Sequence, residues 1–226
     1  MDNQNQSKQE KINLSKGDFV EIKYTGTVEG RIFDSNILED AKKINEKANP
    51  EKTIVIIGQN MLVKGLDKEL EGKELNKSYE ITLEPKDAFG FRRTDLVRII
   101  PLKVFHEQRL IPRQGASFVF DNQLAKVIAV SGARVITDFN NPLAGKEVTY
   151  KFSVSRIVND LKEKAETVCK LLFGYIPKID VENESIIING PKILENFLTQ
   201  LQPKFKEFLG KEVSFKETVQ EKSQKQ

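Results

Sequence analysis

Apolar and polar residues alternate in several short stretches of the chain, and this alternation predicts strands with one buried face. It occurs in residues 17–24 (GDFVEIKY), 79–85 (YEITLEP) and 147–158 (EVTYKFSVSRIV). One register of the last strand would bury a set of four residues: Val148, Tyr150, Phe152 and Val154. The other register would bury the residues between them, and the pattern alone does not choose. The short β-branched run TIVIIG (53–58) predicts a buried strand.

The pattern changes after Gly90. Four short apolar runs follow, separated by turn-rich pieces, at residues 96–101, 116–120, 124–130 and 134–139. Short strands joined by turns such as DNQ and SGA are typical of a small β-rich module. We therefore expect a separate β-rich segment over residues 92–140.

Helical spacing of apolar residues predicts helices in two parts of the chain. The first is residues 62–72, where Leu62, Val63, Leu66 and Leu70 share a face and Gly72 ends the helix. The second part begins at residue 159, with an amphipathic helix at 161–173 stopped by Gly174.

After this second helix, further elements are expected in order. They are a hairpin turning near Asn183–Glu184, a helix at 191–210 interrupted near Pro203, and a final strand at 212–219. The resulting order α-β-β-α-β predicts a small α+β domain at 159–226. We expect the whole chain to be of the α+β class.

Composition places the chain among ordinary globular proteins. Of its 226 residues, 38% are hydrophobic and 31% charged. The longest apolar run is far short of the roughly 20 residues of a membrane helix. The polar N-terminus has no apolar segment typical of a secretory signal, so residues 1–15 are expected to form a flexible arm. Cys169 has no partner for a disulfide, and with one histidine, His106, we expect a cytoplasmic protein without a metal or cofactor.

Charge is uneven along the chain, although the net charge is only +3. Residues 92–140 contain eight Lys and Arg against four Asp and Glu. This excess has two interpretations, a solvated face that aids solubility or a surface for acidic polypeptide or RNA. The ribosome is one RNA-containing partner that this segment could contact.

Motifs for nucleophilic, nucleotide-dependent or metal-dependent catalysis are missing from the sequence. His106, in VFHEQ, is better explained as a surface residue than as a general base. An enzyme built from this sequence would therefore need chemistry that uses neither a nucleophile nor a metal.

Three motifs resemble the core of the FKBP-type peptidyl-prolyl cis-trans isomerases. They are VEIKYTGTVEGRIFDSN (20–36), VIIGQNMLVKGLDKELEG (55–72) and LEPKDAFG (83–90). Two later pieces, IPLKVF (100–105) and NPLAGKEVTYKFSV (141–154), resemble the SlyD-like subfamily. In that subfamily a β-rich insert-in-flap domain with chaperone activity interrupts the isomerase fold.

The resemblance implies a division of the chain and a fold for each part. Residues 16–91 and 141–158 would form an FKBP-type antiparallel sheet wrapped on a short helix, interrupted by the insert at 92–140. Residues 159–226 resemble in length and arrangement the extra domain of longer archaeal members, and this domain could form a homodimer.

The resemblance also implies the residues of a prolyl-isomerase site. Tyr24 would be the pocket tyrosine, Phe33 a wall, and Asp34 the carboxylate beside the reacting carbonyl, hydrogen-bonded to Tyr24. Taken singly, an aromatic such as Phe33 followed by Asp34 is equally consistent with an ordinary strand, whose side chains alternate between faces.

Five further residues complete the implied site. Leu62 and Val63 would lie where the helix starts, and Val63 would donate its backbone N–H to the substrate. Leu66 would form the floor, Phe89 a side wall and Phe152 the back. Leu66 replaces the tryptophan of single-domain relatives, and Phe89 replaces their tyrosine. The lost hydroxyl removes one hydrogen bond to the substrate, worth about 1 kcal/mol.

For the insert we expect a hydrophobic groove that holds unfolded or extended polypeptide by adding it as a strand. The candidate residues are Ile99, Ile100, Val104, Phe105, Phe118 and Phe120, some of which must belong to the core. The expected function is prolyl isomerisation with chaperone activity on unfolded or proline-containing polypeptides. The alternative is a non-enzymatic chaperone that holds polypeptides on an FKBP-like scaffold.

Overall fold

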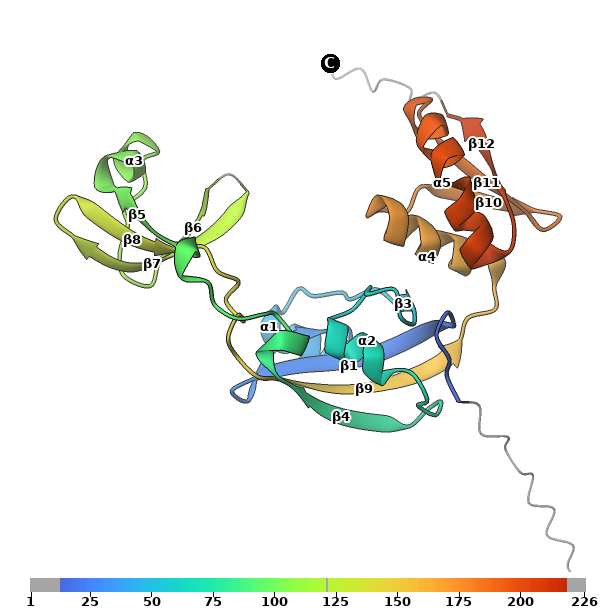
Figure 1. The fold of residues 1–226 in the computed structure, drawn as a ribbon, viewed down its shortest axis with the longest axis horizontal. Coiled ribbons are helices and arrows are strands. Elements are labelled where there is room, and N and C mark those ends of the chain that lie inside the picture. Colours follow the sequence, from blue (N-terminus) through green and yellow to red (C-terminus); the bar gives the residue numbers. More distant parts are fainter. Residues whose placement is uncertain (1–12, 121, 219–226) are drawn as a thin grey trace, which may run out of the picture. The chain divides into compact units, whose positions relative to one another are not determined.

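The computed structural model describes residues 13–120 and 122–218 (Figure 1). The chain divides into two compact units. The first comprises residues up to Gly26, Ile32–Ile81, and the chain from Tyr150 onward. The second comprises Thr27–Arg31 and Thr82–Thr149, and so extends beyond the predicted insert, 92–140, at both ends. We describe each unit by itself.

A five-stranded sheet forms the centre of the first unit, and some of its strands continue into the second. Its order is β2-β1-β9-β4, and β3 pairs with β1. The strands are β1 (Phe19–Val28), β2 (Arg31–Ser35), β3 (Thr53–Ile56), β4 (Ser78–Leu83) and β9 (Val148–Ile157). In β9 the buried residues are Val148, Tyr150, Phe152 and Val154, which decides the register that the pattern left open. Buried residues therefore alternate with less buried ones from Val148 to Val154, as expected for a strand with one face in the core.

Two short helices connect strands of this sheet in the order of the chain. Helix α1 (Leu38–Ile44) buries only Ala41, and helix α2 (Lys64–Glu69) buries Leu66. The prediction of a helix over 62–72 is therefore too long. Val63 has extended backbone angles (φ −55°, ψ 134°) and precedes the first turn. Gly72 lies beyond the helix in the left-handed region.

The predicted arm, residues 1–15, lies mostly outside the described residues. Its last residues are paired: Leu14 is buried, its N–H donates to the carbonyl of Lys73, and its carbonyl accepts from the N–H of Gly72. These hydrogen bonds fasten residues 13–15 beside the end of α2.

The second unit contains a four-stranded antiparallel sheet of order β5-β8-β7-β6. Its elements are η1 (Pro85–Asp87), η2 (Thr94–Leu96), β5 (Val97–Pro101), α3 (Leu102–Glu107), β6 (Ser117–Phe120), β7 (Gln123–Ser131) and β8 (Arg134–Asp138). The pattern did not predict helix α3. This helix directly follows Pro101 and places Phe105 in a core with Val127 and Val135, so its burial stabilises a turn of helix that has little periodicity of its own.

A polar cluster joins the two chain segments that enter and leave this sheet. Asn140 accepts the N–H of Arg93 at 2.8 Å and donates to the carbonyl of the same residue at 2.9 Å. Asp138 accepts hydrogen bonds from Asn140 and pairs with Arg92. Burial alone raises the pKa of the Asp138 carboxyl. The N–H groups of Asn140 and the guanidinium of Arg92 outweigh burial, so this pKa lies below its ordinary value.

The C-terminal part of the first unit has the element order α-β-β-α-β. Its elements are α4 (Leu161–Phe173), β10 (Lys178–Glu182), β11 (Ser185–Gly190), α5 (Ile193–Leu209) and β12 (Val213–Glu217). Strand β11 pairs antiparallel with β10 and parallel with β12. Asn183 and Glu184 both have positive φ, which a two-residue hairpin turn with the twist of its strands requires.

The predicted interruption of the last helix is wrong, because α5 runs through Pro203 without a break. Pro203 lacks an N–H and cannot donate to the fourth residue before it, but tertiary packing outweighs that loss. Leu194, Leu198 and Phe205 are all buried on one side of the helix, on both sides of Pro203.

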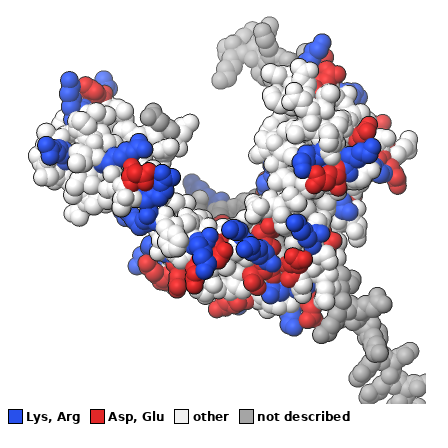
Figure 2. All heavy atoms as spheres, viewed as in Figure 1, with Lys and Arg blue, Asp and Glu red and all other residues white. Residues whose placement is uncertain are grey.

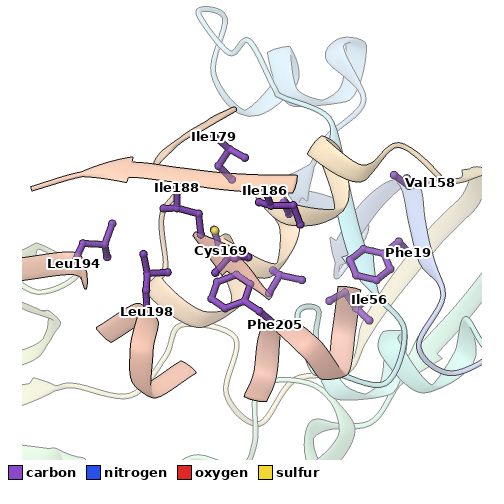
Figure 3. Packing of buried hydrophobic residues seen from close by; sticks show 13 residues of the cluster. Phe19, Ile56, Val158, Cys169, Ile179, Ile186, Ile188, Leu194, Leu198 and Phe205 are labelled. Atoms are coloured by element: carbon purple, nitrogen blue, oxygen red, sulfur yellow. The ribbon is translucent and has the colours of Figure 1, made fainter. Parts of the chain in front are cut away.

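One hydrophobic core joins this C-terminal part to the five-stranded sheet (Figure 3). Phe19 of β1, Ile56 of β3 and Val158 belong to the same buried cluster as Cys169 and Phe205. The N–H of Val158 donates to the carbonyl of Phe19 at 2.7 Å.

An ion-pair network supports the same junction. Arg156 of β9 binds Glu21 of β1, and it binds both carboxylate oxygens of Glu163 of α4 at 2.8 and 2.9 Å. The C-terminal part is therefore attached by a continuous core and by charged hydrogen bonds. Among the described helices, none is both long and apolar enough to cross a membrane.

Candidate active site

Tyr24 and Asp34 lie on the adjacent strands β1 and β2 and are joined by a hydrogen bond. The Tyr24 hydroxyl donates to Asp34 Oδ2 at 3.1 Å. Burial of the phenol, followed by the charge of Asp34 and this hydrogen bond, raises the pKa of Tyr24. The phenol therefore stays protonated and keeps donating to Asp34, whose side chain is exposed.

Two further aromatic rings, those of Tyr150 and Phe33, form a cluster with Tyr24 of this pair. The ring of Tyr150, from β9, lies 6.1 Å from the ring of Tyr24 and 5.7 Å from that of Phe33, measured between centroids. The Phe33–Tyr150 pair is close to perpendicular, an edge-to-face arrangement that aromatic rings favour. The structure thus brings Tyr24, Phe33 and Asp34 together, and it adds Tyr150, which was not among the predicted site residues.

Gly26 makes this close packing of rings feasible. A Cβ atom on Gly26 would lie 2.7 Å from Cζ of Phe33 and 2.9 Å from Cε1 of Tyr150. Both distances are well inside the carbon–carbon contact distance of about 3.5–4.0 Å. Any larger residue at position 26 must therefore displace both rings.

The hydroxyl of Tyr150 is the second polar group of the aromatic cluster. Burial, and then the charge of Asp34, raise the pKa of Tyr150, so this phenol is also protonated. Within residues 13–120 and 122–218 its hydroxyl forms no hydrogen bond, and it is not among the fully buried polar atoms that lack a partner. Tyr150 as a whole is 2% exposed, so only the small accessible part of this hydroxyl is available as a donor to a ligand.

Asp67 of α2 holds the loop that leads to Leu62 and Val63. Its two carboxylate oxygens accept the N–H groups of Gly58 at 3.1 Å and Asn60 at 3.0 Å, and its side chain is buried. The carbonyl of Val63 accepts the N–H of Asp67 at 3.0 Å. In the described part of the chain, the N–H of Val63 has no acceptor, so it can donate to a ligand.

Leu66 and Phe152 are placed differently from the other predicted site residues. They are 1% and 2% exposed, and Phe152 stacks on Tyr79 with 5.6 Å between ring centroids. In this conformation both pack in the core, and almost none of their side-chain surface is open to a ligand. Their direct contact with a substrate stays a prediction.

Phe89 belongs to the second unit. It follows the η1 turn, which the N–H of Gly90 closes by donating to the carbonyl of Pro85 at 2.7 Å. Its side chain is partly buried. Whether it forms a wall of the site stays a prediction.

The insert residues fall into two groups. Ile99, Ile100, Val104 and Phe120 line a cavity of about 530 Å3, together with Arg98, Gln108, Val119, Gln123 and Phe139. Phe105 is completely buried, and Phe118 packs against it with 5.7 Å between ring centroids. The prediction that Phe105 contacts a bound polypeptide is therefore wrong for this conformation, because α3 turns its side chain into the core. Phe118 is a partly buried neighbour of that core.

Sequence reasoning missed three residues of the site: Gly26, Asp67 and Tyr150. Tyr150 appeared only in one of two registers for β9, and Gly26 only inside a motif. Asp67 follows a buried leucine on a helix, and no local signal shows that a preceding loop needs its carboxylate. No group of three or more His, Cys, Asp and Glu in the described residues could hold a metal ion.

Comparison with known proteins shows which family the chain resembles. Residues 10–124 match the family model described as FKBP-type peptidyl-prolyl cis-trans isomerase. A short-type peptidyl-prolyl cis-trans isomerase of Methanocaldococcus jannaschii is 32% identical over 148 residues, which cover 63% of this chain and 94% of that protein. The FKBP-type isomerase SlyD of Vibrio cholerae is 28% identical over 143 residues, 62% of this chain and 68% of SlyD. An FKBP-type 16 kDa isomerase of Escherichia coli is 29% identical over 114 residues, 48% of this chain and 76% of that protein.

Proposed function

Because the chain belongs to the FKBP-type peptidyl-prolyl cis-trans isomerase family, we propose that prolyl bonds isomerise at the aromatic cluster and that the insert holds the polypeptide that contains them. The observation that supports the catalytic part is the Tyr24–Asp34 hydrogen bond beside the Phe33–Tyr150 pair. We place this activity in the cytoplasm.

The chemistry needs no covalent step. Rotation about the X–Pro bond passes a barrier of about 18–20 kcal/mol, because the C–N bond loses its resonance. The twisted amide has less charge separation than the planar one, so an aromatic, water-poor site stabilises it more than water does. This is catalysis by preferential binding of the transition state.

Three polar groups would orient the substrate. Asp34 lies beside the reacting carbonyl, and Tyr24 holds its carboxylate in place. The free N–H of Val63 donates to a substrate carbonyl. Tyr150 supplies a hydroxyl in the same aromatic cluster.

The cavity of the insert lies at strand edges rather than over a sheet face. Consecutive side chains of a strand point to opposite faces, yet both Ile99 and Ile100 of β5 line it, and so do both Val119 and Phe120 of β6. Strands β5 and β6 are the two outer strands of the sheet, and among the described strands neither pairs on its outer side. Free strand edges bind extended polypeptide through main-chain hydrogen bonds, largely independently of sequence.

Holding and isomerisation would support each other. A polypeptide bound at the insert has its prolyl bonds at a high local concentration for the isomerase site in the same chain. Unfolded, proline-containing polypeptides are therefore the proposed substrates.

Turnover on a short X–Pro peptide tests the catalytic proposal. Tyr24→Phe and Tyr150→Phe should each lower kcat/KM by about fivefold, since a hydrogen bond contributes about 1 kcal/mol. Asp34→Ala should lower it further. The matched control is Tyr175→Phe, at an exposed tyrosine of the C-terminal part, which should leave turnover unchanged. Wild-type protein without turnover that still suppresses aggregation of an unfolded protein would instead support a non-enzymatic chaperone on an FKBP-like scaffold.

Two partner proposals follow from surface features. Ile193 and Phe197 are 69% and 54% exposed, one helical turn apart on α5, and we propose that this pair supports a homodimer through the C-terminal part. A monomeric mass by light scattering would remove that proposal.

The basic insert is the proposed contact for the ribosome. Co-sedimentation with ribosomes that does not weaken with added salt would argue against this electrostatic contact.

A further inference from the structure

Arg98 is the only charged residue among the described residues that line the insert cavity. The rest of the lining is apolar, apart from Gln108 and Gln123. Lys and Arg outnumber Asp and Glu in the sequence of the insert, residues 92–140, and Figure 2 shows basic side chains on the visible face of the molecule around this part. Among the described residues, the cavity lining therefore combines mostly apolar side chains with one positive charge.

The acidic residues described in the insert are already paired. The three ion pairs are Arg92–Asp138, Arg93–Asp95 and Lys103–Glu107. Arg98 forms no ion pair within residues 13–120 and 122–218. Its charge is thus available to a bound molecule.

The guanidinium of Arg98 is also held in place. It lies over the ring of Phe139, 5.6 Å from the centroid. Its Nε lies 3.5 Å from the carbonyl of Asp95, longer than a well-formed hydrogen bond. The terminal N–H groups form no hydrogen bond with described residues, and they present the planar fork that matches a carboxylate.

We propose that Arg98 makes the insert cavity selective for extended apolar segments that carry a carboxylate side chain. This inference rests on the proposed holding function of the insert. A segment added along the edge of β5 points alternate side chains into the cavity, where Ile100, Val104 and Phe120 take apolar groups and Arg98 takes an Asp or Glu. Unfolded polypeptides with acidic residues between apolar ones would be preferred over basic ones.

Fluorescence anisotropy with three labelled peptides tests this selectivity on the full chain. The peptides are blocked at both ends, free of proline so that the isomerase site is not engaged, and identical except for Glu, Gln or Lys at one central position. The wild type should bind the Glu peptide about three- to fivefold more tightly than the Gln peptide at low salt, and the Lys peptide most weakly. Arg98→Gln should abolish the difference between the peptides, and Arg98→Glu should reverse their order.

The matched control is Arg134→Gln, which removes another exposed arginine of the same sheet that does not line the cavity. It should keep the wild-type preference. Equal affinities of the wild type for all three peptides would overturn the role of Arg98 but not the holding function. An equal loss of preference in Arg98→Gln and Arg134→Gln would also overturn the role of Arg98, because the preference would then come from the overall positive charge of the insert. If no peptide binds, the holding function itself fails. If the Glu peptide binds but single-stranded RNA displaces it, and this RNA binding depends on Arg98, the cavity is assigned to nucleic acid and the proposal is overturned.

Discussion

Replacing Gly26 by alanine should damage the active site while leaving the fold intact. The φ angle of Gly26 is not in the left-handed region, and alanine in a strand is ordinarily favoured over glycine by about 0.5–1 kcal/mol. Here the added Cβ would meet Phe33 at 2.7 Å and Tyr150 at 2.9 Å. Overpacking of this kind typically costs about 1–3 kcal/mol. We therefore expect a net loss of up to about 2 kcal/mol in the free energy of unfolding.

The loss of activity should exceed the loss of stability. Relieving the contacts requires both rings to move by about 1 Å, and a displacement of that size in a catalytic site can cost about 100-fold. Prolyl-peptide turnover should fall by about 10- to 100-fold, and urea denaturation should still show one cooperative transition.

Gly190→Ala is the matched control. Its Cβ would meet Cδ2 of Leu194 at 2.9 Å, in the C-terminal part of the chain. It should change stability without changing turnover. The reasoning would be refuted if Gly26→Ala kept wild-type turnover, because the rings would then have room to move. It would also be refuted if Gly190→Ala lost as much activity.

Three further predictions concern the core, the thiol and the insert. Phe205→Ala should lower the free energy of unfolding by about 3–5 kcal/mol and lower the Tm of the isomerase part with it, because Phe205 shares a core with Phe19. The matched control Phe91→Ala, at an exposed phenylalanine, should change stability by less than about 0.5 kcal/mol. Two separate calorimetric transitions would contradict the shared core. Burial, and then the charge of Glu166, raise the pKa of Cys169 to about 12. Native protein at pH 8 should therefore resist alkylation by iodoacetamide until it unfolds. The free energy of unfolding should fall as pH rises from about 9 towards 12, because in this range only the thiol of the unfolded chain ionises. Because folding lowers the pKa of Asp138, its carboxylate contributes to the free energy of unfolding fully above about pH 4, and this contribution is lost as pH falls through the folded pKa. Asp138→Asn should therefore loosen the insert at neutral pH, which faster hydrogen exchange in β5 and β8 would detect. The same variant should remove part of the acid sensitivity of the insert.

Local patterns and motifs were sufficient for the class of fold and for the family. The predicted α+β class is confirmed, and so is the identification as an FKBP-type prolyl isomerase. The helix at Leu161–Phe173 was readable because Asp160 caps its start, apolar residues recur at helical spacing, and Gly174 adopts the left-handed conformation at its end. Each of these signals lies within a few residues of the structure it determines.

Tertiary structure decided the features that depend on contacts between distant residues. Only packing against the rest of the sheet selects which face of β9 is buried and so brings Tyr150 to Phe33. Only burial of Leu198 and Phe205 carries α5 through Pro203, against a local signal to stop. Likewise, the six apolar insert candidates are chemically alike, and the course of α3 and the edges of β5 and β6 separate core from cavity. The sequence by itself determined which residues are apolar, aromatic or charged, whereas the fold determined which of them meet, because burial is a property of the whole chain rather than of any one segment.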